Sequence, residues 1–228
     1  MRLTLAILAT LSTVDLTSAR SLLARQDGDA NPFEGRQLYV NPKYTESLEE
    51  TRQSFLGAGD EDNAGKVQFV QEQVGSFVWI SNIALLDDID AAIENARSVQ
   101  EKTGEEQIVG LVLYNIPDRD CSAGESSGEL SLADGGLDRY MKEYVGPFSE
   151  KVLDAEDLQF SIVVEPDAVA NMVTGGDIEA CADTAEPQQD GIAYAIQQLQ
   201  ARNVHLYIDI ANGGWLGSKE NAESGKSP

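Results

Sequence analysis

Three short apolar runs constrain the fold of this chain more than any other feature. They span residues 108–113, 160–164 and 204–208, and each is unbroken and partly β-branched. Runs of this kind are typical of strands buried on both faces of a parallel sheet. Stretches with helical spacing precede them, at residues 91–103, 137–153 and 188–201. Because strands that alternate with helices form right-handed parallel crossovers, the sequence predicts an α/β fold. Further predicted elements are a strand at 77–80 and helices at 44–56 and 66–74.

Each of the three runs ends at a turn that carries an acid. Pro117 stops the first run ahead of Asp118–Asp120, the second continues into Glu165–Asp167, and the third ends at Asp209. Since the carboxyl ends of parallel strands meet at one edge of a sheet, these acids are expected to converge on one cleft. Asp-Arg-Asp can also form an ordinary solvated turn. The recurrence at three strand ends favours the cleft, and carboxyls around a cleft suit general acid chemistry on an acetal.

The motifs around these acids resemble those of glycoside hydrolase family 6. The matching segments are Tyr114–Cys121, Gly128–Glu129, Ala133–Gly136, Glu165–Asn171, Cys181, Tyr207–Asp209 and Gly214–Gly217. The match begins near Asn31 and runs to Gly217. The resemblance implies a distorted parallel β/α barrel, of which this chain would hold the first half and a little more. It also implies a secreted cellobiohydrolase or endoglucanase that hydrolyses β-1,4-glucan with inversion.

The resemblance assigns a role to five residues. Asp167 would donate the proton to the glycosidic oxygen, and Asp120 would support its protonation and help to order the hydrolytic water. Tyr114 would press on the reacting sugar ring and assist its distortion. Ser126 would contribute to the water network, and Asp209 would bind substrate. For Asp209, an ordinary helix cap or turn acid is the alternative. Independently of the resemblance, a donor beside an apolar strand end and near other acids is expected to have a raised pKa.

Three more residues are candidate sugar contacts. Trp215 could be a stacking platform for a glucose ring, or a core aromatic. Asn212 stands where the family usually has histidine, and Tyr39 stands where an N-terminal tryptophan of the sugar site is expected. These changes predict weaker binding at the outer subsites. The single histidine, His205, lies within the third run and is expected to be a packed side chain.

The two cysteines, Cys121 and Cys181, are predicted to form one disulfide, because paired cysteines are typical of secreted chains, with free thiols as the alternative. The family pairs the matching cysteines. Such a bridge would tie the loop after one acid-bearing strand to the segment after the next. It would thereby hold Asp120 and Asp167 in a fixed relation.

The chain divides into four segments. Residues 1–19 have a short basic start and an apolar core too short to cross a bilayer, which predicts a secretory signal, with a buried helix as the alternative. Residues 20–30 are expected to be flexible. Residues 31–217 form the predicted catalytic domain, and 218–228 a polar tail. The protein is therefore expected outside the cell.

The net charge of −23 argues against nucleic acid and anionic membranes as partners. It leaves a neutral glucan or cello-oligosaccharide as the expected partner, and it leaves the oligomeric state open. No metal-ligand cluster, phosphate loop or Ser/His/Asp arrangement stands out in the sequence, so no metal or cofactor is predicted.

Two alternatives to an active glucanase remain at this point. The family continues with further strands, a second disulfide, tunnel tryptophans and an aspartate often proposed as the base, which this chain would lack. It could therefore be a shortened, non-catalytic relative that binds glucan or another extracellular partner. It could also come from an incomplete gene record.

Overall fold

The computed structural model describes residues 31–123 and 125–224, and the fold is that of the unit Pro32–Pro228. The predicted signal at 1–19 and the predicted flexible segment at 20–30 lie outside the described residues. So do residues 225–228 of the predicted polar tail.

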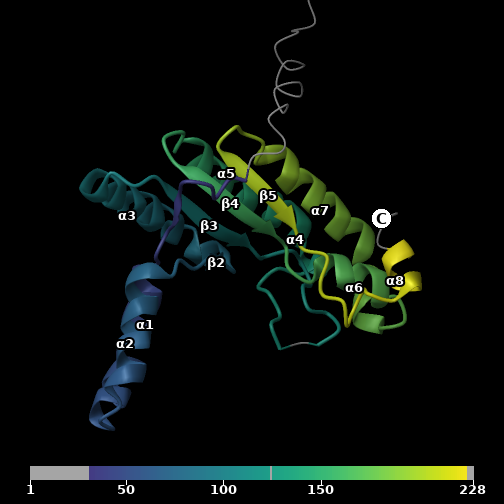
Figure 1. Ribbon diagram of the computed structural model, residues 1–228. Helices are drawn as coiled ribbons and strands as arrows, with labels where there is room; N and C mark the ends of the chain where they lie inside the picture. The colour runs from purple at the N-terminus through teal and green to yellow at the C-terminus, as the bar shows by residue number, and fades with distance from the viewer. Residues whose placement is uncertain (1–30, 124, 225–228) are drawn as a thin grey trace, which may run out of the picture. The chain divides into compact units, whose positions relative to one another are not determined.

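Parallel strands form the single sheet of the described unit (Figure 1). They are β1 (Gln37–Leu38), β2 (Val78–Ile80), β3 (Gln107–Leu113), β4 (Gln159–Val164) and β5 (Val204–Ile208). The order is β1-β3-β4-β5, and β2 pairs with β3 beside the later residues of that strand. This arrangement confirms the predicted α/β fold with a parallel sheet.

Helices connect the strands. They are α1 (Pro42–Gly57), α2 (Glu61–Gln73), α3 (Asp87–Thr103), α4 (Gly136–Arg139), α5 (Gly146–Leu153), α6 (Ala168–Thr174), α7 (Ala185–Gln198) and α8 (Lys219–Ser224). Shorter turns are the 3₁₀ segments η2 (Ile83–Leu85), η3 (Leu132–Asp134) and η5 (Glu179–Cys181), and the π-helical segment η4 (Tyr140–Val145).

The helix predicted at 137–153 is continuous in the structure but changes pitch in the middle, where η4 separates α4 from α5. Pro147 lies at the start of α5, and it has no backbone N–H to donate to the preceding turn. The N–H of Gly146 bonds the carbonyl of Met141, five residues back. A wider turn before a proline is a common way to relieve such a gap.

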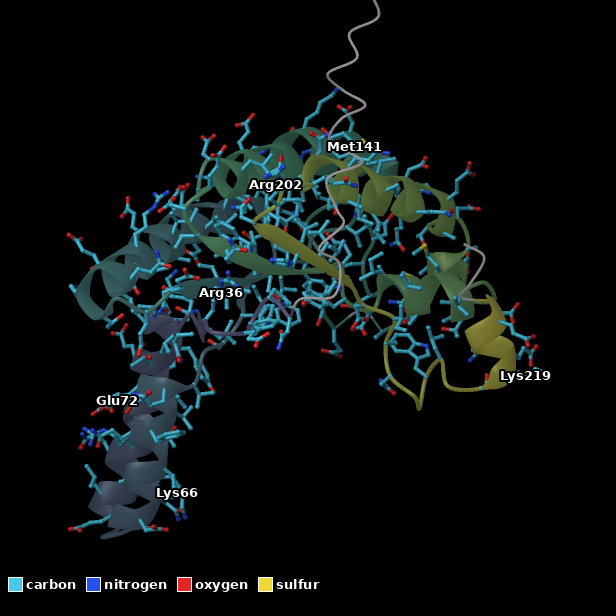
Figure 2. The ribbon with its side chains drawn as sticks, turned by 45° about the horizontal axis from the view of Figure 1, so that its top comes forward. Arg36, Lys66, Glu72, Met141, Arg202 and Lys219 are labelled. Carbon is cyan, nitrogen blue, oxygen red and sulfur yellow. A yellow bond between two sulfur atoms is a disulfide. The ribbon has the colours of Figure 1, made fainter. Side chains whose placement is uncertain are left out.

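The helical pair α1–α2 packs mainly within itself. No residue of α1 is buried, and α2 buries only Ala64 and Gln71. Figure 2 shows Lys66 and Glu72 on this pair, where Lys66 bonds Asp62 one turn earlier.

The hydrophobic core lies between β3, β4 and the helices α3, α5 and α7. Leu111 and Leu113 of β3 and Ile162 and Val164 of β4 are fully buried. Because the sheet is covered here, the ends of β3 and β4 are fixed by packing. No helix in the described part of the chain is both long and apolar enough to cross a membrane.

Candidate active site

The strands β3, β4 and β5 end at the same level of the sheet. Leu113 pairs with Val164, and Val164 pairs with Ile208. The segments that follow these residues therefore leave from one rim, as the sequence pattern indicated. We call this edge the acid rim and define it by Tyr114, Asp120, Asp167 and Asp209.

On the β3 side, Tyr114 and Asp120 are brought into direct contact. The Tyr114 hydroxyl donates to Oδ2 of Asp120 at 2.5 Å. Asp118 and Asp120 have positive φ values, 52° and 53°, so the turn after Pro117 is tightly folded. The Arg119 guanidinium lies 4.1 Å from the centre of the Tyr114 ring. Tyr114 is thus held by a charge on its face and an acid at its hydroxyl.

On the β4 side, Asp167 meets Asp209 from β5. The backbone N–H of Asp167 donates to Oδ1 of Asp209 at 3.0 Å. The same oxygen accepts the N–H of Ala211 at 2.9 Å, so Asp209 also acts as the turn acid foreseen as its alternative. Asp167 precedes α6 with a φ of 65°, and its side chain makes no capping hydrogen bond to that helix.

The electrostatics at Asp167 reflect this crowding. Burial raises the pKa of Asp167, and the negative charges of Asp209 and Asp120 raise it further. Both charges act on Asp167, so the structure brings the acids of three strands near one another.

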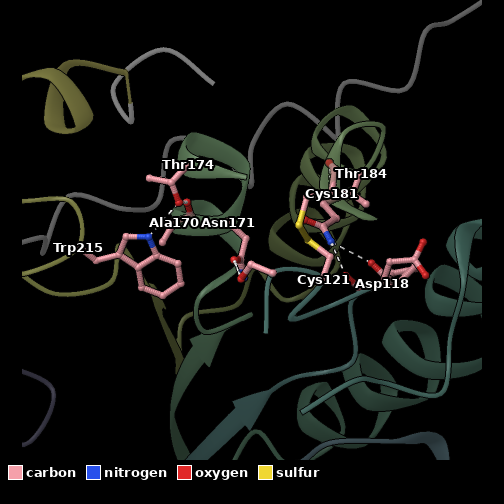
Figure 3. Close-up of a disulfide and its surroundings, with 11 residues drawn as sticks. Asp118, Cys121, Ala170, Asn171, Thr174, Cys181, Thr184 and Trp215 are labelled. Carbon is pink, nitrogen blue, oxygen red and sulfur yellow. Dashed lines mark hydrogen bonds between the residues drawn. A yellow bond between two sulfur atoms is a disulfide. The ribbon is translucent and has the colours of Figure 1, made fainter. Parts of the chain in front are cut away.

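The predicted disulfide is present. Cys121 and Cys181 are joined with a Cα–Cα distance of 5.3 Å. It connects the β3 loop to η5, just beyond α6 (Figure 3). Beside it the Ser122 hydroxyl donates to Oδ1 of Asn171 in α6 at 2.7 Å. Both links fasten the Asp120 loop to the helix that Asp167 precedes.

Trp215 lies on the other side of α6 (Figure 3). Its indole N–H donates to the hydroxyl of Thr174 at 2.9 Å, and its ring is half-buried. Asn212 is exposed and folds the turn that carries Trp215: its Oδ1 accepts the N–H of Gly214, and its carbonyl accepts that of Trp215. Trp215 lies beside α6 and Asn212 in the turn that precedes it, and their sugar contacts stay predictions.

Ser126 is exposed on the loop after Cys121. Its carbonyl accepts a hydrogen bond from Nε of Arg119 at 2.7 Å, and a second arginine nitrogen bonds the carbonyl of Ser81 after β2. Arg119 therefore anchors the Ser126 loop through carbonyls. The part of Ser126 in a water network stays a prediction.

Tyr39 is not at the acid rim. Its backbone N–H bonds the carbonyl of Ile108, six residues before Tyr114 along β3. That separation is roughly 20 Å of extended strand. Only 2% of Tyr39 is exposed, and burial raises its pKa to about 12. The prediction of a sugar-facing Tyr39 is therefore corrected: the side chain is a core residue, because β1 pairs with the first residues of β3.

Trp79, which the sequence reasoning missed, takes the place beside Tyr114. The two rings meet edge to face, with centroids 5.2 Å apart. Trp79 is 51% exposed, whereas its neighbours Val78 and Ile80 are buried. The sequence pattern that could have identified Trp79 is a short apolar strand with a tryptophan in the middle, because alternate residues of a strand face opposite sides of the sheet.

Glu165 was also missed. Its side chain is fully buried and accepts hydrogen bonds from the N–H groups of Asn115 and Ile116 and from the Tyr140 hydroxyl. Burial raises the pKa of Glu165 to about 7, and those donors and Arg119 oppose the shift. Glutamates are rarely fully buried unless they are paired, so the residue type alone did not predict that Glu165 is buried.

Among residues 31–123 and 125–224 there is no group of three or more His, Cys, Asp or Glu side chains that could hold a metal ion. The acid rim consists of three carboxyls and the Tyr114 ring at the end of a parallel sheet. Carboxyls in this arrangement can serve general acid chemistry.

The comparisons with known proteins agree with this arrangement. The model of the glycosyl hydrolases family 6 matches residues 33–227. A probable exoglucanase GH6D of Podospora anserina is 64% identical over 97% of this chain and 50% of its own length. The chain belongs to glycosyl hydrolases family 6.

Solved structures show the same relation. Endoglucanase CEL6B from Humicola insolens has 58% identity and a TM-score of 0.83, covering 86% of this chain and 56% of that one. The CcCel6A catalytic domain complexed with p-nitrophenyl beta-D-cellotrioside has 36% identity and a TM-score of 0.79, covering 86% of this chain and 53% of that one. The chain spans about half the length of these relatives.

Proposed function

We propose that this chain acts as a secreted glucanase, which hydrolyses β-1,4-glucosidic bonds of cellulose or a related β-glucan with inversion. The observation that carries the proposal is the position of Asp167. Its backbone N–H bonds Asp209, and its pKa is raised by burial and then by the charges of Asp209 and Asp120. A general acid must hold its proton at working pH, so these surroundings suit the donor of an acetal cleavage.

Each side chain of the acid rim has a part in the proposed reaction. Asp167 protonates the glycosidic oxygen as the bond to the leaving sugar breaks. Asp120, with the Tyr114 hydroxyl on one of its oxygens, favours the protonated form of Asp167 and orders the attacking water together with Ser126. The ring of Tyr114 presses on the sugar and assists its distortion. Asp209 fixes the backbone of Asp167 and contacts substrate.

The substrate class follows from the aromatic side chains and the relatives. Trp79 offers an exposed face beside Tyr114, and Trp215 offers a half-buried one beside α6. Aromatic faces stack on the apolar faces of glucose rings. The relatives carry cellulase names, and one solved relative holds a cellotrioside.

Secretion is supported by the disulfide between Cys121 and Cys181, since disulfides persist in oxidising compartments. The net charge of −23 fits a soluble extracellular protein, and residues 1–19 have the pattern of a secretory signal.

The test is reducing-sugar release from soluble β-glucan by the full chain, expressed in a secreting host, beside Asp167→Asn. We expect the variant to lose on the order of 100-fold or more of the rate. Asp62→Asn makes the same chemical change on the exposed face of α2 and should keep the full rate. The first product should be the α-anomer by proton NMR. Equal rates for wild type and Asp167→Asn would rule the proposal out.

A non-catalytic glucan-binding role is the second candidate. It is favoured by the exposure of Trp79, which a purely structural tryptophan beside Tyr114 would not need. It predicts that the chain is retarded in a β-glucan gel without releasing sugar. Retardation should persist in Asp167→Asn and fall in Trp79→Ala.

A further inference from the structure

The carboxylate of Glu165 joins the two acid-bearing loops from inside the protein. It belongs to the segment that follows β4. Both of its oxygens lie 3.1 Å from the N–H of Asn115, and Oε2 also accepts the N–H of Ile116 at 3.0 Å. Those two residues follow Tyr114 directly, so the bonds cross from the β4 loop to the β3 loop.

A third donor closes this network. The hydroxyl of Tyr140, in η4, donates to Oε1 of Glu165 at 2.8 Å. The groups that face the carboxylate are Tyr140 and Tyr144 of η4 and Arg119 of the β3 loop. In each of these hydrogen bonds an oxygen of Glu165 is the acceptor.

The backbone around Glu165 explains what these bonds hold in place. Glu165 and Asp167 have φ values of 43° and 65°, which non-glycine residues seldom adopt. Such a backbone persists only where its surroundings fix it. The N–H of Glu165 bonds the carbonyl of Leu113, and its side chain bonds the backbone after Tyr114. The turn that brings the backbone N–H of Asp167 to Asp209 is therefore fixed to β3.

We propose that Glu165 is a positioning residue, whose buried carboxylate holds the Tyr114–Asp120 loop and Asp167 at the spacing that the acid chemistry needs. The inference rests on the proposed function, because it names what sets the geometry of that same site. Glu165 itself does not face the acid rim, so it takes no part in proton transfer to the sugar.

The decisive variants are Glu165→Gln and Tyr140→Phe. A glutamine keeps the size of the side chain but has one oxygen and one NH₂, so it cannot accept from all three donors. Tyr140→Phe removes one donor and leaves the carboxylate on the β3 backbone, so its effect should be intermediate and should remain measurable if Glu165→Gln fails to fold. Val152→Ala is the control for lost stability alone, since Val152 is fully buried in α5.

Two readouts separate positioning from stability. The first is the pKa of Asp167 from carbon-13 carboxyl NMR, which needs no catalysis. In Glu165→Gln it should fall toward the ordinary value, because the loop relaxes away from Asp209 and Asp120. The second is kcat on soluble β-glucan well below the melting temperature, which should fall on the order of 100-fold with a smaller change in KM.

Val152→Ala should lower the melting temperature yet leave the pKa of Asp167 unchanged and kcat within about twofold. If Glu165→Gln or Tyr140→Phe behaves like Val152→Ala in both readouts, the positioning role is overturned. If the wild-type chain releases no sugar but the pKa of Asp167 falls in the variants, the proposed function fails while the positioning of Asp167 by Glu165 stands.

Discussion

At the scale of single residues, the site depends on like charges that are kept close together. Asp167 is partly buried, and Asp209 and Asp120 act on it from the neighbouring loops. Backbone N–H groups hold Asp209 in place, so it cannot easily turn away from Asp167. Because of this crowding, the Asp167 carboxyl keeps its proton to higher pH than an ordinary aspartate does.

Replacing Asp209 by asparagine should lower the pKa of Asp167. Asparagine keeps an oxygen that can accept the Asp167 N–H, but it removes a negative charge. Because the donor must be protonated, kcat falls as pH rises through the pKa of Asp167. In Asp209→Asn this fall should begin at a lower pH. The pH dependence of kcat on soluble β-glucan measures it, and an unshifted profile would show that Asp209 does not act on Asp167 by charge.

Glu165 makes a separate prediction about stability. The pKa of Glu165 is about 7 in the folded chain and 4.5 for an ordinary glutamate, as in the unfolded chain. Between pH 4.5 and 7 the folded chain therefore binds more protons than the unfolded chain. The free energy of unfolding should therefore fall as pH rises from about 4.5 to 7, by about 3 kcal/mol at most from this group. Urea unfolding at several pH values measures the slope, and Glu165→Gln should flatten it. A slope that is equal in the two proteins would contradict this account.

At the scale of elements, the long buried strands were predictable and the irregular parts were not. The runs at 108–113, 160–164 and 204–208 became β3, β4 and β5 within a residue, because buried strands are apolar throughout. The expectation that all three are buried on both faces was wrong for β5, whose Tyr207 and Ile208 are 43% and 49% exposed. The two residues of β1 have no period to detect, which is why Tyr39 was misplaced. The convergence of the acids was predictable because the carboxyl ends of neighbouring parallel strands meet at one edge of the sheet.

The burial of Glu165 and the contact of Trp79 with Tyr114 depend instead on side-chain packing between segments far apart in the chain. Local sequence patterns do not carry that information, since the same residue types are common on surfaces. The strands and their shared rim were therefore predictable, and the contacts within the site were not.

The contact of α7 with the β3 loop leads to a further prediction. A Cβ added at Gly191 would lie 2.7 Å from Cδ1 of Ile116, so this fully buried side chain would have to shift within the packed core. Gly191→Ala should lower the free energy of unfolding by about 1–3 kcal/mol. Gly65→Ala in α2 meets nothing within 4 Å and should raise it by about 0.5–1 kcal/mol. Chemical denaturation measures both changes, and a neutral Gly191→Ala would show that α7 can move away from the rim.

At the scale of the whole molecule, one margin of the sheet carries exposed apolar side chains. Tyr207 and Ile208 of β5 are 43% and 49% exposed, and Ile210 just beyond is 67% exposed. Within the described residues β5 pairs with β4 alone. An open edge strand with apolar side chains tends to pair with other chains.

We therefore expect concentration-dependent self-association of this chain, which Ile210→Glu should reduce by placing a charge beside the open edge. Ser54→Glu adds the same charge on exposed α1 and should have little effect. Sedimentation velocity over a range of concentrations measures the association. Equal association of the two variants would place the contact elsewhere on the surface.

The most direct test of the central claim is a carbon-13 carboxyl NMR titration of the wild-type chain, with Asp167→Asn used to assign the Asp167 signal. The claim is that neighbouring acids and burial keep Asp167 protonated at higher pH. We predict that Asp167 titrates above 3.8, the value of an ordinary aspartate. A titration at or below that value would contradict the account.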